Sequence, residues 1–256
     1  DSRPGTETTL SETDLPKAWD GKERINVLLM GIDQRQGETE RGYRTDTMML
    51  LTIDPVTLQA GMLSIPRDLW VPIPGYGNNR INLANYYGDA DDYPGGGPAL
   101  AKKTVEQVIG VRVHHYVRIN FTAFESLIDR IGGITIDVPE DIYDPKYPTG
   151  NYGIEVFSIK KGKQVLDGAT ALKYARTRNT KFGDFDRAKR KQQVIIAIQE
   201  KTKDWQIRIS KSGVKAIVTH HKTLTYFFDR FGIKNPAFLE PKPGIPPTAS
   251  HTLEVI

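Results

Sequence analysis

Arginines in this sequence gather where expected strands and helices end. A guanidinium group is a planar fork of N–H donors that can hold a phosphate or a carboxylate through two hydrogen bonds at once. Loops at the strand edges of α/β proteins are also the usual place for ligands. The pattern therefore predicts an anion site, and its candidate members are Arg35, Arg41, Arg44, Arg67, Arg80, Arg176, Arg178, Arg187 and Arg190.

Some of these arginines are expected to be ordinary surface residues, because exposed ion pairs with nearby aspartates are common and weak. Arg41 and Arg190 are the candidates for this plainer role. Arg187 is different, since it falls in the first turn of an expected helix, where free backbone N–H groups also attract anions. Arg176 and Arg178 are two residues apart in a segment that leaves a helix, so both side chains could point the same way.

Two aspartates, Asp33 and Asp46, each adjoin an expected buried strand and have arginines close in the sequence. They are either structural, as ion-pair partners or turn formers, or ligands of a hard cation. Mg²⁺ takes few protein carboxylates, keeps water, and completes its shell with phosphate oxygens of the substrate. In the second reading, two aspartates among arginines form a metal–pyrophosphate site.

Other kinds of chemistry are excluded or disfavoured by what the sequence lacks. It has no cysteine, which rules out disulfides, thiolate catalysis and cysteine-ligated zinc. It also lacks the short motifs of nucleotide-binding loops, serine hydrolases and zinc proteases. His114 and His115 are neighbours in an expected strand, so they face opposite ways and cannot share a site. The net charge of +4 is mild and the arginines lie beside aspartates, so we expect no nucleic-acid partner.

The candidate residues must be positioned by a central sheet. Continuous apolar runs at Ile25–Asp33, Thr47–Asp54 and Leu58–Pro66 are typical of buried strands, and the last run leads directly into Arg67. Strands and helices alternate along the chain, which favours an α/β fold of three layers, α-β-α. The other expected elements are strands at His114–Phe121 and Ile134–Glu140, and helices in the segments 95–110, 122–133 (with Thr122 as N-cap), 167–178 and 183–205.

The ends of the chain differ in composition from its middle. Residues 1–22 are rich in Ser, Thr, Glu, Asp and Pro and are expected to be a polar linker. Residues 23–204 are expected to form one domain, in which Asp141–Gly153 is an exposed loop. Beyond this the pattern weakens, and residues 205–256 are expected to be an atypical C-terminal extension. No run approaches the length of a membrane span, so any membrane anchor of the parent gene would precede this chain.

Four motifs together resemble the LytR-CpsA-Psr (LCP) family of bacterial proteins. They read NVLLMGIDQR…YRTDTMMLLTID, MLSIPRDLWVPIPGYGNNRINLANYYG, GATALKYARTRNT and GDFDRAKRKQQVI, and they occur in the family's order between about residues 24 and 200. The resemblance implies a mixed central sheet flanked by helices. It also implies a protein of the cell envelope, displayed on the extracytoplasmic face of the bacterial cell membrane by an N-terminal membrane anchor.

The resemblance also implies roles for individual residues. Asp33 and Asp46 fall at positions that hold Mg²⁺, and the implied catalytic residues are Arg67, which would stabilise charge on the transferring phosphate, and Asp46. The sequence departs from the family where Lys191 replaces one of two glutamines that usually follow an arginine, although a lysine still suits an anion. The implied pyrophosphate-binding residues are Arg44, Arg67, Arg80, Arg176, Arg178, Arg187 and Gln192.

On this resemblance, the protein is expected to be a phosphotransferase that moves an anionic glycopolymer from a polyprenyl-pyrophosphate carrier to peptidoglycan with the help of Mg²⁺. Such reactions are catalysed mainly by positioning and electrostatics. A non-catalytic protein that binds polyprenyl phosphate and regulates cell-wall assembly would share the same arginines. Turnover separates the two alternatives, whereas the identity of the glycopolymer and of the acceptor hydroxyl stays open.

Overall fold

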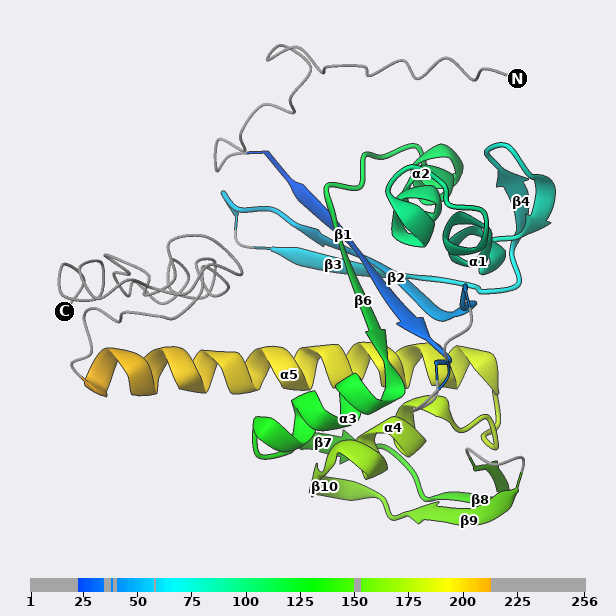
Figure 1. The fold of residues 1–256 in the computed structure, drawn as a ribbon. Helices are drawn as coiled ribbons and strands as arrows, with labels where there is room; N and C mark the ends of the chain where they lie inside the picture. The colour runs from blue at the N-terminus through cyan, green and yellow to red at the C-terminus, as the bar shows by residue number, and fades with distance from the viewer. Residues whose placement is uncertain (1–22, 35–37, 39–40, 58, 150–152, 213–256) are drawn as a thin grey trace, which may run out of the picture. The chain divides into compact units, whose positions relative to one another are not determined.

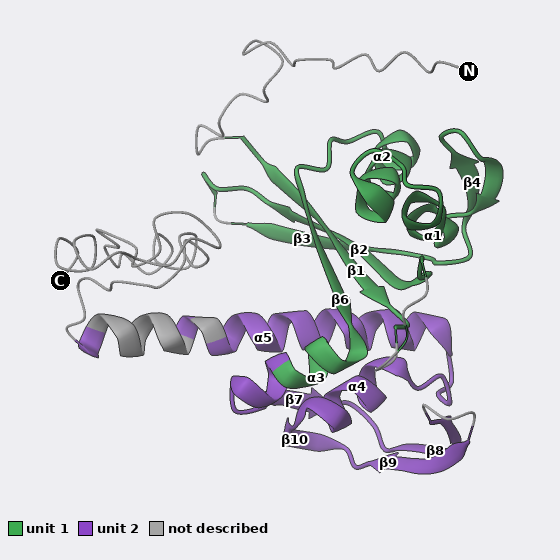
Figure 2. Cartoon of the chain, viewed as in Figure 1, with its two compact units in different colours: residues 1–126 green, residues 127–256 purple. Residues whose placement is uncertain are grey.

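The computed structural model describes residues 23–34, 38, 41–57, 59–149 and 153–212 (Figure 1). The chain divides into two compact units, and the division falls after Ser126 (Figure 2). Each unit has its own sheet and its own helices. The linker expected over 1–22 and most of the extension expected over 205–256 lie outside the described residues, so both stay predictions, as does the single domain expected over 23–204.

The first unit is built on a four-stranded sheet in the order β3-β2-β1-β6. β1 pairs antiparallel with β2 and parallel with β6, and β2 pairs antiparallel with β3, so the sheet is mixed. The α/β class with a mixed central sheet, expected from the sequence, is therefore confirmed. The strands are β1 (Ile25–Ile32), β2 (Thr45–Ile53), β3 (Ala60–Ile65) and β6 (His115–Asn120).

Two helices, α1 (Leu83–Ala90) and α2 (Gly96–Ile109), share a hydrophobic core with this sheet. Leu28 of β1 and Leu100 of α2 are fully buried members of that core. The two helices touch through glycines, because a Cβ added to Gly97 would lie 2.2 Å from the backbone oxygen of Asn85. No side chain fits at this contact, so glycine at position 97 is required for the helices to pack.

Two further segments of the chain differ from what the sequence predicts. The Gly- and Asn-rich stretch after Arg67 is typical of a loop, but it forms a hairpin of β4 (Trp70–Ile73) and β5 (Gly77–Arg80). Helix α3 (Phe121–Arg130) is capped by the Asn120 carboxamide, which accepts from the backbone N–H of Ala123 at 2.8 Å. The expected cap at Thr122 is therefore wrong, because Asn120, two residues earlier, satisfies the helix N-terminus.

The second unit contains two antiparallel strand pairs and two helices. β7 (Ile134–Val138) pairs with β10 (Gly162–Leu166), and β8 (Ile142–Pro148) pairs with β9 (Ile154–Ile159). The exposed loop expected over Asp141–Gly153 is thus wrong for its first part. Its composition is polar and rich in proline, but Ile142, Asp144 and Tyr147 of β8 are buried.

Helix α4 (Gly168–Arg176) starts where the sequence predicts, because the Asp167 carboxylate accepts the backbone N–H of Thr170 at 2.8 Å. Helix α5 (Asp184–Ser212) begins at a predicted N-terminal aspartate and continues past residue 204 to Ser212. Among the helices that the structure describes, none is long and apolar enough to cross a membrane.

Candidate anion-binding site

Asp46 is placed at the edge of the first sheet by a β-bulge. Ile32 pairs with Thr45 and Gly31 pairs with Thr47, so Asp46 is an extra residue with no partner opposite it on β1. A bulge of this kind interrupts the regular alternation of side chains and turns one of them in a new direction, which is why bulges recur beside active sites.

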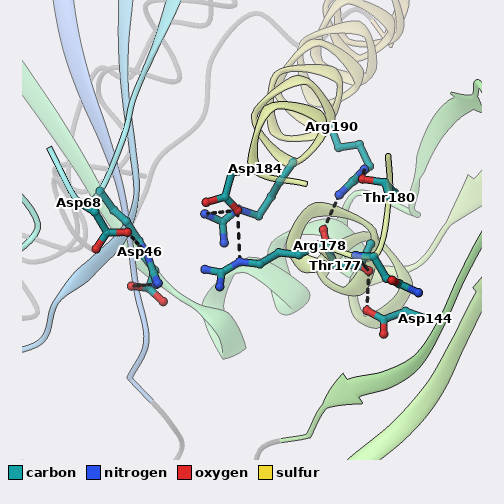
Figure 3. Close-up of polar contacts among 11 residues, drawn as sticks. Asp46, Asp68, Asp144, Thr177, Arg178, Thr180, Asp184 and Arg190 are labelled. Atoms are coloured by element: carbon teal, nitrogen blue, oxygen red, sulfur yellow. Dashed lines mark hydrogen bonds and ion pairs between the residues drawn. The ribbon is translucent and has the colours of Figure 1, made fainter. Parts of the chain in front are cut away.

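Arg67 lies opposite this bulge because of the antiparallel pairing of β2 with β3. Met48 of β2 pairs with Ile65, the last residue of β3. Asp46 lies two residues before Met48, and Arg67 lies two residues after Ile65. Their side chains form an ion pair of 2.8 Å between Arg67 Nη1 and Asp46 Oδ1, and both groups are only partly exposed (Figure 3). Burial alone would lower the pKa of the Arg67 guanidinium, but the carboxylates of Asp46 and Asp68 outweigh it and raise the pKa.

The backbone around this pair is braced by Asn82, which is buried. The Asn82 carbonyl accepts the N–H of Thr45 at 3.2 Å, and its own N–H donates to the Arg67 carbonyl at 3.2 Å. One residue therefore links the strand that carries Asp46 to the turn that carries Arg67, which holds the two charged groups in register.

Asp68 extends the pair into a chain of charges. Its carboxylate accepts from Arg67 Nε at 3.3 Å and lies 3.6 Å from Arg80 Nη1, and Arg80 itself is 57% exposed. Arg67 and Arg80 are thus brought together, as predicted for an anion site. Asp68 was not among the predicted site residues, although the adjacent Arg67-Asp68 pair at the end of an apolar strand is a signal for it.

The two predicted metal ligands differ in their surroundings. Asp33 directly follows β1, and its Oδ1 atom is buried without a hydrogen-bond partner in the described part of the chain. An orphaned carboxylate oxygen of this kind fits a missing cation, because buried acceptors normally have a partner. Asp46, in contrast, already has Arg67 as a partner. No group of three or more potential metal ligands occurs among the described residues.

In the second unit, Asp184 at the N-terminus of α5 joins two of the predicted arginines. Its Oδ1 atom lies 3.3 Å from Arg178 Nε and 3.2 Å from Arg187 Nη2 (Figure 3). The Arg187 side chain is only 13% exposed, whereas Arg178 is half exposed. Asp184 thus links Arg178, which follows α4, to Arg187, which lies in the first turn of α5. The sequence predicted Asp184 only as the start of a helix.

Of the remaining predicted residues, Arg176 and Gln192 belong to the second unit and Arg44 belongs to the first. Arg176 donates to the Tyr147 hydroxyl at 3.3 Å, and its guanidinium lies 5.8 Å from the centre of the Tyr147 ring. Gln192 is partly buried on α5, as is Lys191. Arg44 is exposed immediately before β2. Arg35 lies outside the described residues.

The two arginines expected to be ordinary surface residues behave differently. Arg41 is 80% exposed and pairs with Asp92 at 3.5 Å, which confirms its plain role. Arg190 is only 4% exposed, so that expectation is wrong for it. Its guanidinium is buried because it finds hydrogen-bond acceptors inside the protein, which sequence spacing does not reveal.

These features define a class of protein: a mixed α/β chain that holds paired arginines and aspartates at the ends of strands and helices. The chain belongs to the LytR_cpsA_psr family, whose family model matches residues 3–223. The resemblance seen in the four sequence motifs is therefore confirmed.

Two curated relatives and one solved structure illustrate the match. The chain is 36% identical over 203 residues to the polyisoprenyl-teichoic acid–peptidoglycan teichoic acid transferase TagU of Oceanobacillus iheyensis, covering 79% of this chain and 58% of that protein. It is 34% identical over 201 residues to the regulatory protein MsrR of Staphylococcus aureus, covering 78% of this chain and 55% of that protein. The chain thus spans little more than half the length of these relatives.

The solved structure is that of the LytR-CPS2A-psr family protein YwtF (TagT) with bound octaprenyl pyrophosphate lipid. It matches with a TM-score of 0.58 and 28% sequence identity, over 96% of this chain and 92% of that one. The agreement supports the mixed α/β fold.

Proposed function

We propose that this protein is a phosphotransferase that moves an anionic glycopolymer from a polyprenyl-pyrophosphate carrier to peptidoglycan. The observation that carries the proposal is the Arg67–Asp46 pair at the bulged sheet edge, in a family whose relatives include a teichoic acid transferase and a structure with a bound prenyl pyrophosphate. The substrate and the acceptor place the protein in the cell envelope, on the outer face of the membrane.

In the proposed reaction, a hydroxyl of the muramic acid in peptidoglycan attacks the phosphorus that carries the sugar. A new P–O bond forms, the bond to the polyprenyl phosphate breaks, and polyprenyl phosphate leaves with the bonding electrons. The hydroxyl proton must pass to a base, and Asp46 is the proposed acceptor among the site carboxylates. Negative charge grows on the departing phosphate, and fixed cations around it lower the barrier.

Arginines supply that positive charge in the proposal. Arg67 is held charged by its carboxylate neighbours and is placed by backbone hydrogen bonds, so it needs little rearrangement to act. Arg44, Arg80, Arg176, Arg178, Arg187 and Gln192 are the further proposed pyrophosphate-binding residues.

Mg²⁺ is the proposed cofactor, and Asp33 and Asp46 are the residues that would hold it. The unpartnered Oδ1 atom of Asp33 is the structural observation that fits such an ion. When bound, Mg²⁺ would neutralise phosphate oxygens and help orient them.

A second candidate function is regulation without catalysis, and it is favoured by the likeness to MsrR, which is named a regulatory protein. Such a protein would bind polyprenyl phosphates through the same arginines without transferring anything. The two candidates make different predictions for turnover.

The deciding experiment incubates the protein with a lipid-linked glycopolymer, peptidoglycan and Mg²⁺, and measures polymer attached to peptidoglycan. We expect attachment by the wild type, and a loss of about 100-fold or more for Arg67→Met, as for removal of a group that stabilises transition-state charge. Arg41→Met removes an exposed arginine of the same unit and serves as the control. Binding of the lipid without any attachment by the wild type would favour the regulatory alternative.

A further inference from the structure

Residues 177–180 are the first part of the segment between α4 and α5. They have no regular secondary structure, but their polar groups are held by hydrogen bonds. The Thr177 hydroxyl donates to Asp144 Oδ2 at 2.6 Å, and both residues are buried (Figure 3). Asn179 Nδ2 donates to the Tyr143 carbonyl at 2.7 Å. Strand β8 therefore holds this segment from one side.

Arg190 of α5 makes two hydrogen bonds to this segment and one to the last turn of α4. Its Nε donates to the Tyr174 carbonyl at 2.8 Å, its Nη2 donates to the Thr177 carbonyl, and its Nη1 donates to the Thr180 hydroxyl at 3.4 Å. The guanidinium also lies 5.7 Å from the centre of the Tyr174 ring. One side chain thus ties the last turn of α4 and both ends of the segment to α5.

Arg178 is the exception within this segment. Its neighbours are fixed by Asp144, Tyr143 and Arg190, while its own side chain is half exposed. Within the part of the chain that the structure describes, its one ion pair is with Asp184, which is itself 61% exposed. A backbone held this firmly limits the directions that the Arg178 side chain can take. Such preorganisation of Arg178 reduces the conformational entropy that is lost when a ligand binds.

The burial of Arg190 also needs an explanation, because removing a guanidinium from water is costly unless its donors are satisfied. Here they are satisfied by backbone carbonyls and a hydroxyl rather than by a carboxylate. Only the planar fork of arginine spans acceptors on both Tyr174 and Thr177, whereas a lysine ammonium is a point charge on a flexible stem.

We propose that Arg190 is a positioning residue, which fixes segment 177–180 so that Arg178 is presented to the diphosphate of the substrate. The inference rests on the proposed function for its ligand, and goes beyond it by assigning a role to a buried residue that does not itself contact substrate.

The test measures binding of farnesyl pyrophosphate in the presence of Mg²⁺ by calorimetry. We expect Arg190→Lys to weaken binding about tenfold, which corresponds to the partial loss of one charge-assisted interaction. Arg130→Lys, an exposed arginine in the last turn of α3, is the matched control and should bind as the wild type does. Asn179→Ala removes one anchor from the exposed side and should weaken binding in the same direction, even if Arg190→Lys does not fold.

A double-mutant cycle shows whether Arg190 acts through Arg178. In an Arg178→Met background, Arg190→Lys should change binding by less than about twofold, because the group that it positions is gone. Amide hydrogen exchange of residues 177–180 should be faster in Arg190→Lys without any ligand.

The outcomes separate the two proposals. Failure of the wild type to bind farnesyl pyrophosphate would overturn the proposed function and the ligand assigned to Arg178. Wild-type binding with an unaffected Arg190→Lys variant, or with a loss that persists in the Arg178→Met background, would overturn the positioning role alone.

Discussion

Arg67 is paired before any substrate arrives, with Asp46 at 2.8 Å and Asp68 at 3.3 Å. A phosphate that binds Arg67 must therefore compete with a carboxylate for its donors. The competition keeps the guanidinium oriented and lowers the affinity for simple anions. At the scale of single residues, the acidic partners thus matter as much as the arginines.

Asp68→Asn should make this competition visible. The change removes a carboxylate that bridges Arg67 and Arg80, and we expect farnesyl pyrophosphate to bind about two- to fivefold more tightly, in line with the energy of a partly exposed ion pair. Calorimetric titration gives the affinity. Asp92→Asn removes the same charge from the exposed pair with Arg41 and controls for net charge. Weaker binding by Asp68→Asn would show that the carboxylate orients the arginines rather than competing.

Asp33→Asn should act on the metal instead. The Oδ1 atom of Asp33, which is buried and has no hydrogen-bond partner among the described residues, is the proposed Mg²⁺ ligand. Loss of this charged group should raise the Mg²⁺ concentration needed for half-maximal farnesyl pyrophosphate binding by about tenfold. A Mg²⁺ titration of ligand binding measures this directly. An unchanged Mg²⁺ requirement, with normal binding otherwise, would remove Asp33 from the metal site.

At the scale of elements, helix α4 carries a buried tyrosine whose titration can be followed. Burial raises the pKa of the Tyr174 hydroxyl from its ordinary value of 10.0 to about 12, and the hydroxyl donates to Gln193 Oε1 at 2.7 Å. The unfolded chain loses this proton at a lower pH than the folded chain does. The contribution of Tyr174 to stability is therefore complete below pH 10 and falls between pH 10 and about 12.

Denaturant unfolding at several pH values tests this. The difference in the free energy of unfolding between the wild type and Tyr174→Phe should shrink as the pH rises through that window. Tyr143→Phe removes the hydroxyl of a tyrosine that is 59% exposed and serves as the comparison variant. A difference that stays constant with pH would mean that the Tyr174 hydroxyl titrates normally.

The elements that the sequence predicted well are those with a simple periodic signal. The apolar runs of β1, β2 and β3 and the caps of α4 and α5 are local features, so they can be found without knowledge of the fold. β8 was missed because its inward face includes the charged Asp144, which is buried only because Thr177 donates to it from a distant segment.

The residues of the candidate site also fall into those that the sequence indicates and those that it does not. Arg67, Arg178 and Arg187 were predicted because arginines at element ends are visible in the sequence. The bulge that turns Asp46 depends on strand register, and the burial of Arg190 depends on contacts of α5 with α4 and with the segment that follows it. Neither feature produces a local sequence pattern. The bridging roles of Asp68 and Asp184 are also products of folding.

At the scale of the whole molecule, the proposed function predicts where a bound ligand should slow amide hydrogen exchange. Hydrogen exchange with and without farnesyl pyrophosphate and Mg²⁺ tests this. We expect slower exchange around Asp46 and Arg67 and also around Arg178 and Arg187, because a bound ligand suppresses local opening. Unchanged exchange around either pair would remove that pair from the proposed pyrophosphate-binding residues, and Arg67→Met should abolish the response around Asp46.

The glycine contact between α1 and α2 offers a way to disable the protein without altering any charged group. A methyl group at position 97 would sit 2.2 Å from the Asn85 carbonyl, so the helices would have to separate. Asn85 also donates to the Tyr43 carbonyl, next to the strand that carries Asp46, and the disturbance would reach that strand. For a geneticist, Gly97→Ala is thus a loss-of-function change that leaves every charged group of the sequence in place.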